Sequence, residues 1–225
     1  MTTKATIRAM KLEMNASSNP FIVNPTVIWD DQHAILIDTG IPGQLELIQE
    51  QLELHYFPFH RLSHIMITHQ DRDHLGSLPE LAAVSEGVVE VLAHELSVPY
   101  IQGEVPLLKS GNTVPFTQVD QSLKDGDIIP LCGGIRVIAT PGHTPDHISL
   151  YHIPSKTLIS GDAMIANEGQ LLPPAEQHTA DMGAALASVG KLVDYEIESV
   201  ICYHGGICTG NIRERLIEIS AGSQL

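Results

Sequence analysis

Basic residues are scarce in this chain of 225 residues. Lysine and arginine together number 12, against 27 aspartates and glutamates, which gives a formal net charge of −15 at pH 7 with histidine neutral. This balance repels a phosphate backbone, and no cluster of Lys and Arg offsets it locally. The composition therefore argues against nucleic acid as a partner.

Long apolar runs are missing as well. No segment approaches the roughly 18 consecutive apolar residues that a membrane span requires. The N-terminal sequence MTTKATIRAMKLEM contains no apolar run followed by a small-residue cleavage site. We therefore expect a protein of the cytoplasm that does not enter a membrane.

Cysteine is rare and forms no paired motif. Cys132, Cys202 and Cys208 are an odd number and include no CxxC spacing. This usage is typical of reduced thiols and excludes a disulfide framework. We expect all three to pack as small hydrophobic core residues.

The chain has enough apolar residues for one sizeable core. Hydrophobic residues make up 43% and charged residues 17%, and this length suits a single domain spanning residues 1–225. Period-2 runs predict strands at residues 21–29, 34–38, 65–68, 88–93, 135–139, 148–151, 157–160 and 200–203. Helical spacing predicts helices at 43–54 and 78–84, one capped by Asp181 and reaching residue 192, and one capped by Asn211. This alternation indicates layered α/β or α+β packing.

Four potential metal ligands follow one predicted strand within six residues. The sequence from residue 65 is IMITHQDRDHLG, which places His69, Asp71, Asp73 and His74 directly after a β-branched run. Zinc and iron accept imidazole nitrogen together with carboxylate oxygen. The alternative is an ordinary polar loop in which Asp73 caps a helix.

Four other loops at strand ends repeat this device. They place a histidine or aspartate beside glycine at Asp38, His143, Asp162 and His204. Glycine at such positions lets the backbone approach an ion or a substrate closely. Packing alone does not explain this repetition, so the sequence predicts a metal site gathered from several loops.

These residues resemble the metallo-β-lactamase-fold hydrolase superfamily. Its usual pattern is H-x-H-x-D-H followed by a lone His, a lone Asp and a final His, and the match covers essentially the whole chain. The resemblance implies a four-layer αββα sandwich with two divalent metal ions, zinc foremost and iron or manganese as alternatives, at one edge. It implies that His69, Asp71 and His143 bind the first ion, that Asp73, His74 and His204 bind the second, and that Asp162 bridges the two.

The second histidine of the family pattern is Asp71 here, which gives HxDxDH. Asp71 either ligates the first ion, or orients His69, or leaves the first site weak. With direct ligation, three aspartates, two divalent ions and a bridging hydroxide sum to zero charge, where a histidine would leave +1. A less positive cluster acidifies its water less, and two histidines with one carboxylate also suit iron or manganese.

The resemblance implies hydrolysis of an ester, lactone, thioester or amide bond in a small molecule. In the mechanism that it implies, a hydroxide bridging the two ions would attack the carbonyl, the second ion would stabilise the oxyanion, and Asp73 would orient the hydroxide. An iron-dependent oxygenase or redox enzyme on the same fold, and a non-catalytic metal-binding protein, are the alternatives. Too few residues follow His204 for the helical domain of glyoxalase II, and Ile165 stands where the quorum-quenching lactonases have tyrosine.

Three further features lie near the predicted site. His147 is expected to support a ligand or the backbone by a hydrogen bond. His178, in the loop that follows Pro173 and Pro174, is a candidate substrate contact. The segment 95–116 either covers the site or packs as an ordinary surface loop.

Overall fold

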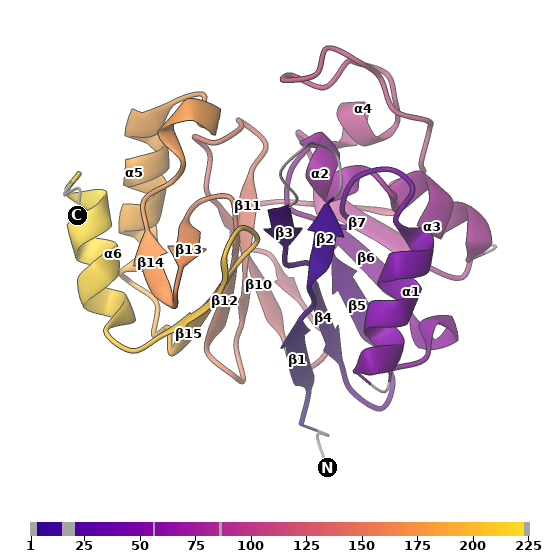
Figure 1. Cartoon of the computed structure of the whole chain (residues 1–225), viewed down its shortest axis with the longest axis horizontal. Coiled ribbons are helices and arrows are strands. Elements are labelled where there is room, and N and C mark those ends of the chain that lie inside the picture. The colour runs from indigo at the N-terminus through magenta and orange to yellow at the C-terminus, as the bar shows by residue number, and fades with distance from the viewer. Residues whose placement is uncertain (1–3, 15–20, 56, 86, 223–225) are drawn as a thin grey trace. The chain divides into compact units, whose positions relative to one another are not determined.

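The chain folds as two compact units, Met1–Leu123 and Lys124–Leu225, each with one six-stranded sheet (Figure 1). The computed structural model describes residues 4–14, 21–55, 57–85 and 87–222. Among these residues no helix has the length and apolarity that a membrane crossing requires. The two units are described in turn.

The sheet of the first unit combines antiparallel and parallel strands. Its order is β1 (Thr6–Ala9), β4 (Thr26–Trp29), β5 (Ala34–Ile37), β6 (His64–Ile67), β7 (Glu90–His94) and β8 (Gln121–Leu123). From β5 onward the neighbours are parallel. Parallel strands that start in register end at one edge of the sheet, and the residues after β5 and β6 therefore lie side by side there. The bond from Asp38 N–H to Met66 O, 2.9 Å, extends this pairing beyond β5.

Helices form the connections that parallel strands need. In the first unit they are α1 (Leu45–Leu54), α2 (Arg72–Leu75), α3 (Leu78–Val84), α4 (Val98–Ile101) and a 3₁₀ helix at Phe59–Arg61. α1 joins β5 to β6 and buries Ile48 and Leu52, which lie on one face one turn apart. The helices predicted at 43–54 and 78–84 are confirmed.

The strand predicted at 21–29 is wrong as a single element. β3 (Phe21–Val23) pairs with β2 (Leu12–Met14) in a separate two-stranded sheet, while β4 begins at Thr26. Pro25 cannot donate a ladder hydrogen bond, and the Asn24 side chain donates to Met10 O at 2.8 Å. The chain therefore changes sheet at this point.

The sheet of the second unit is mostly antiparallel. Its order is β16 (Gly206–Thr209), β15 (Ser199–Cys202), β12 (Thr157–Gly161), β11 (Ile148–His152), β10 (Ile135–Ala139) and β9 (Ile128–Ile129). Only β12 and β15 are parallel. A hairpin of β13 (Ile165–Asn167) and β14 (Gln170–Leu172), a 3₁₀ helix at Glu176–His178, and the helices α5 (Met182–Leu192) and α6 (Ile212–Ser220) complete this unit.

Two predicted caps have different outcomes in the second unit. Asp181 caps α5, because its side chain accepts a hydrogen bond from Ala184 N–H at 2.9 Å. Asn211 precedes α6 at φ 48°, in the left-handed region, and its side chain makes no capping bond. Its position is as predicted, but its capping function is not observed.

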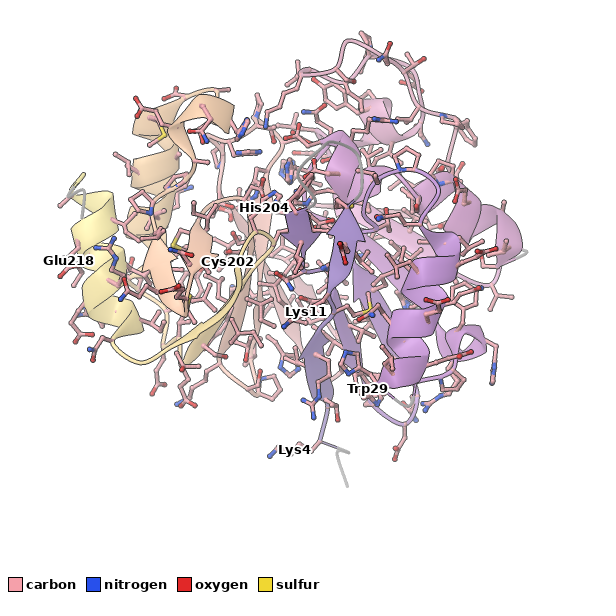
Figure 2. All side chains as sticks on the ribbon, viewed as in Figure 1. Lys4, Lys11, Trp29, Cys202, His204 and Glu218 are labelled. Atoms are coloured by element: carbon pink, nitrogen blue, oxygen red, sulfur yellow. The ribbon has the colours of Figure 1, made fainter. Side chains whose placement is uncertain are left out.

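The cores of both units are aliphatic, and the three cysteines lie in the core of the second unit. Trp29, which is half-buried, ends β4 (Figure 2). Its ring centroid lies 5.5 Å from that of Phe57. Cys132, Cys202 and Cys208 are buried, and none forms a disulfide within the described part of the chain. Burial raises the pKa of the Cys202 thiol. The prediction of buried thiols is confirmed.

Candidate metal centre

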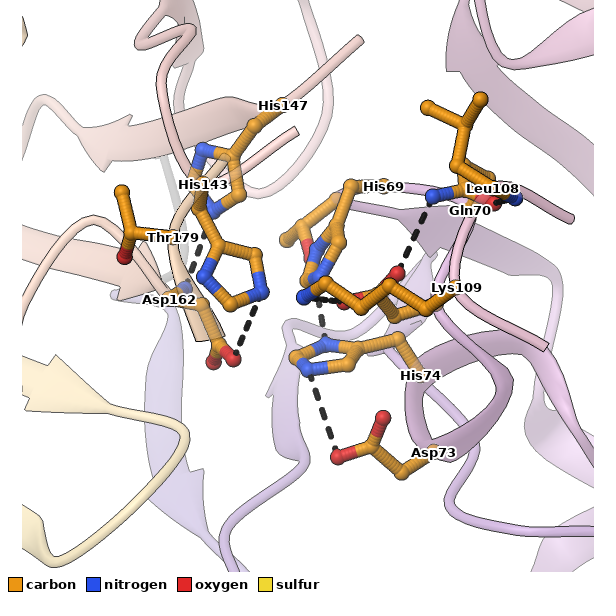
Figure 3. Close-up of polar contacts among 12 residues, drawn as sticks. His69, Gln70, Asp73, His74, Leu108, Lys109, His143, His147, Asp162 and Thr179 are labelled. Atoms are coloured by element: carbon orange, nitrogen blue, oxygen red, sulfur yellow. Dashed lines mark hydrogen bonds and ion pairs between the residues drawn. The ribbon is translucent and has the colours of Figure 1, made fainter. Parts of the chain in front are cut away.

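The segment from Thr68 to His74 follows β6 and runs into α2. It carries four of the predicted ligands and is here called the ligand loop. His69 and His74 are completely buried, with ring centroids 4.0 Å apart (Figure 3). His69 Nε2 lies 3.3 Å from Asp71 Oδ2, and His74 Nε2 lies 3.8 Å from Asp73 Oδ2. The residue at the N-cap of α2 is Asp71, and its side chain makes no capping bond, so the alternative in which Asp73 caps a helix is wrong.

Asp38 organises both histidines from the neighbouring strand end. Its Oδ1 accepts from Thr68 N–H at 2.9 Å, and its Oδ2 accepts from the Thr68 hydroxyl and from His74 Nδ1, both at 2.8 Å. Asp38 has φ 61°, a left-handed conformation that Asp and Asn tolerate better than most residues. The sequence marked Asp38 as a polar strand end but did not reveal these contacts.

These bonds also assign the histidine tautomers. With Asp38 Oδ2 as the acceptor of this bond, His74 donates through Nδ1 and presents Nε2 as an acceptor. The Thr68 hydroxyl gives its proton to Asp38, and its oxygen then accepts from His69 Nδ1 at 3.0 Å. His69 Nε2 is therefore also an acceptor.

The donor set fits a divalent cation. Each acceptor nitrogen faces a carboxylate oxygen, at 3.3 Å for His69 and 3.8 Å for His74. Two electron-pair donors at such distances repel each other unless a positive charge lies between them. Mixed nitrogen and oxygen donors are the set that zinc, iron and manganese accept.

In the second unit the predicted ligands lie around Asp162. Asp162 Oδ2 lies 3.3 Å from His143 Nε2 (Figure 3). The same oxygen lies 3.4 Å from His204 Nε2. The three residues follow β10, β12 and β15, so three separate loops converge on one carboxylate oxygen. One carboxylate oxygen therefore faces two imidazole nitrogens.

His147 supports this carboxylate through the backbone, which confirms the sequence prediction. Its Nε2 accepts from Asp162 N–H at 2.9 Å, and its Nδ1 lies 2.8 Å from Thr140 Oγ1. Thr140 Oγ1 in turn lies 3.0 Å from Ser149 Oγ, which donates to Ser160 O at 3.0 Å. This row of hydrogen bonds fixes the imidazole and therefore the start of the Asp162 loop.

Glycines beside the ligands serve close contacts within the protein. A Cβ on Gly142, at φ 141°, would lie 2.3 Å from Ala185 N in α5. A Cβ on Gly205, at φ 98°, would lie 1.7 Å from Ala166 O in β13. The backbones that carry His143 and His204 are thus fixed against neighbouring elements. We had expected these glycines to allow approach to an ion or substrate, and the contacts observed are with protein backbone.

The segment 95–116 is attached to the ligand loop of its own unit. Leu108 N–H donates to Gln70 Oε1 at 2.9 Å, and Gln70 Nε2 donates to Asp71 Oδ1 at 3.0 Å. Lys109 forms an ion pair with Asp71 Oδ2. No sequence signal distinguishes Lys109, because a lone lysine in an irregular connection is ordinary.

His178 is exposed on the 3₁₀ helix before α5. Its loop returns to the His143 turn through two backbone bonds, from Asp181 N–H to Gly142 O at 2.9 Å and from Ala180 N–H to His143 O at 3.3 Å. The predicted contact of His178 with substrate stays a prediction.

Six of the seven predicted metal ligands belong to groups of His and Asp that suit a metal ion. They are His69, Asp73 and His74 in the first unit and His143, Asp162 and His204 in the second. Asp71 is the exception among the described residues, and its carboxylate is the one paired with Lys109.

The family model described as the Metallo-beta-lactamase superfamily matches residues 18–204. The chain belongs to this superfamily. It is similar to the probable metallo-hydrolase YflN of Bacillus subtilis (strain 168), with 30% identity over 83% of this chain and 81% of that protein. It is also 30% identical to a hydroxyacylglutathione hydrolase of Hydrogenovibrio crunogenus, over 60% of this chain and 41% of that protein, so it spans less than half of that relative.

Solved structures of the metallo-β-lactamase superfamily confirm the predicted fold class. A metallo-beta-lactamase family protein of Thermus thermophilus matches 96% of this chain and 78% of its own, with a TM-score of 0.72 and 20% identity. The hydrolase names of the sequence relatives agree with the predicted enzyme class, so this member of the superfamily is a hydrolytic enzyme.

Proposed function

We propose that this enzyme hydrolyses an ester, lactone, thioester or amide bond of a small molecule with two divalent metal ions. One observation carries the proposal: in each unit, imidazole nitrogens and carboxylate oxygens converge within 3.3–3.8 Å at the positions of the superfamily pattern. We further propose that residues 1–225 form a single catalytic domain.

The proposed ligand assignment follows the superfamily pattern. His69, Asp71 and His143 hold the first ion, Asp73, His74 and His204 hold the second, and Asp162 is shared. Zinc suits this mixed donor set best, and iron and manganese are the alternatives. Divalent ions bound there lower the pKa of a water molecule and polarise the carbonyl group of the substrate.

The side chains of the chain itself position the reactants. The Asp73 side chain is 29% exposed, the most accessible carboxylate of its loop, and it accepts a hydrogen bond from the attacking water and so directs the lone pair of that water. Asp38 and Thr68 keep both histidine rings oriented. We propose that His178, on its exposed 3₁₀ helix, contacts the substrate.

A thioester stands first among the candidate bonds. The name hydroxyacylglutathione hydrolase of one relative denotes hydrolysis of an acyl-glutathione. The chain covers only part of that relative, so the glutathione moiety itself need not be recognised. A panel of simple acyl thioesters, esters, lactones and amides therefore tests the proposed class without assuming the natural acyl carrier.

The test combines metal analysis with this panel. Protein purified without chelator should contain about two ions per chain, because seven ligands exceed the three or four that one ion needs. Chelation should abolish hydrolysis, and reloading should restore it. Asp162→Asn should remain inactive after reloading, whereas the exposed control Asp194→Asn should behave as wild type.

Two outcomes would contradict the proposal. Protein that retains no metal and cleaves no compound of the panel is not a metal-dependent hydrolase. Iron-loaded protein that consumes oxygen with a thiol substrate, and cleaves nothing, is instead an oxygenase on this fold.

A further inference from the structure

Lys109 pairs with Asp71, a proposed ligand of the first metal ion. It reaches Asp71 from the segment 95–116, 38 residues along the chain from its partner. Its side chain is 39% exposed, whereas that of Asp71 is 7% exposed. The carboxylate is thus buried and the ammonium group has access to solvent.

The two oxygens of Asp71 have different environments. Oδ1 accepts from Gln70 Nε2, and Gln70 is itself fixed by Leu108 N–H (Figure 3). Oδ2 faces the acceptor nitrogen of His69 at 3.3 Å, and this is the oxygen that an ion bound to His69 would use. Lys109 pairs with the same Oδ2.

Rotation of the Asp71 carboxylate does not give Lys109 and the metal ion separate oxygens. The bonds from Gln70 hold Oδ1 in place, so Oδ2 stays directed at His69. An ammonium group and a divalent ion repel each other at contact distance, and both need the lone pairs of this one oxygen. Lys109, on a flexible four-carbon stem beside solvent, is the partner that can leave.

We propose that Lys109 and the first metal ion compete for Asp71 Oδ2. This inference rests on the proposed function. With Lys109 paired, the first site lacks its carboxylate, and the ion at Asp73 and His74 binds alone. The first ion binds only when Lys109 swings away, so the two ions bind with unequal affinity and the lysine sets the difference.

The experiment titrates chelator-treated full-length protein with Zn²⁺ against a chromophoric competitor, and repeats the titration with Co²⁺ to follow its absorption spectrum. Wild type should take up one ion tightly and a second weakly. Lys109→Met should tighten the weaker step by about tenfold or more, because it removes the competing charge and leaves Asp71 in place. The tight step should change little.

Three variants separate competition from other effects. Lys109→Arg keeps the charge and should keep the weak step weak. Lys11→Met removes an exposed lysine elsewhere in the same unit and should leave both steps unchanged. In an Asp71→Asn background, Lys109→Met should no longer matter, since the contested carboxylate is gone.

If Lys109→Met leaves the metal affinity of the weaker step within threefold of wild type, or lowers it, the proposed competition is wrong. If wild type binds metal and hydrolyses a substrate of the panel, that result overturns this inference alone. If wild type binds no divalent ion, the proposed function fails and the inference fails with it.

Discussion

The variant Asp38→Asn tests whether Asp38 fixes the orientation and the tautomer of His74. Asparagine has the shape of aspartate and tolerates the left-handed φ of 61°, so the change adds no backbone strain. It replaces one of two acceptor oxygens by an NH₂ donor. Three donors converge on the carboxylate, namely Thr68 N–H, the Thr68 hydroxyl and His74 Nδ1.

The expected losses of stability and of metal affinity follow from these three hydrogen bonds. If the amide oxygen faced His74, the NH₂ group would oppose Thr68 N–H, which cannot accept a hydrogen bond. The other orientation is therefore favoured, because it turns the NH₂ group toward His74 Nδ1 and the Thr68 hydroxyl, which can both become acceptors. Asp38 is 1% exposed, so solvent does not compensate. A lost charge-assisted bond with one buried donor left unsatisfied costs about 2–4 kcal/mol. Once His74 accepts through Nδ1, its Nε2 carries the proton, and metal affinity should fall about 10–100-fold.

Two measurements test Asp38→Asn. Urea denaturation of metal-free protein, followed by the fluorescence of Trp29 in the same unit, measures the loss of stability. Competitive zinc titration and ¹⁵N NMR of the imidazole nitrogens measure the affinity and the tautomer.

Thr39→Val is the matched control for Asp38→Asn. Its hydroxyl donates to the backbone oxygen of His74 at 2.9 Å, which Thr39 N–H also serves at 2.6 Å, so no acceptor is orphaned. This variant should lose about 1 kcal/mol and keep its zinc affinity. An Asp38→Asn protein with wild-type affinity and an unchanged His74 tautomer would refute the assignment.

Four other predictions concern the remaining features. Asp162→Ala should abolish hydrolysis and leave the circular dichroism spectrum unchanged, since Asp162 lies at a strand end; substantial residual activity would contradict its shared role. Asp71→His should shift the rising limb of the pH–rate profile to lower pH and favour zinc, because the cluster gains one positive charge; if neither changes, Asp71 is not a ligand. Gly142→Ala should cost about 2–4 kcal/mol in chemical denaturation, against about 1 kcal/mol for Gly169→Ala, which has positive φ but open space; equal losses would show that the contact with α5 relaxes. Burial lowers the pKa of His152 below its ordinary 6.5, so the unfolded chain binds the proton more tightly and the free energy of unfolding should fall as the pH drops below 6.5. His152→Asn should reduce this dependence of stability on pH, and an unaltered dependence would count against the role of His152.

The strand ends that carry the predicted ligands could be read from the sequence because they depend on local pattern. A β-branched run followed by polar residues and glycine is readable without tertiary contacts, as β6 and its loop show. The helix at 78–84 and the Asp181 cap follow from the same kind of local signal. The order in which strands deliver their ligands came from resemblance to a family, and the comparisons confirm that family.

Contacts between distant segments were beyond the sequence. The pairing of Lys109 with Asp71 depends on the path of an irregular connection, which no periodicity describes. The left-handed Asp38 is set by its bond to Met66 on the neighbouring strand. Strands of two to four residues, such as β9 and β1, are too short for a period-2 pattern to distinguish them from turns.

The ion pair between Lys109 and Asp71 also bears on the order in which the protein folds and acquires metal. Small zinc domains stay unfolded without their ion, because their ligands have no other counter-charge and the binding energy is the folding energy. Here the chain supplies its own cation to a carboxylate that is 7% exposed. The ligand loop can therefore reach its final shape while metal is scarce. With Asp71 as the proposed ligand, metal uptake would then follow folding, and a cell short of metal would accumulate folded, inactive protein that can be recovered by adding the ion.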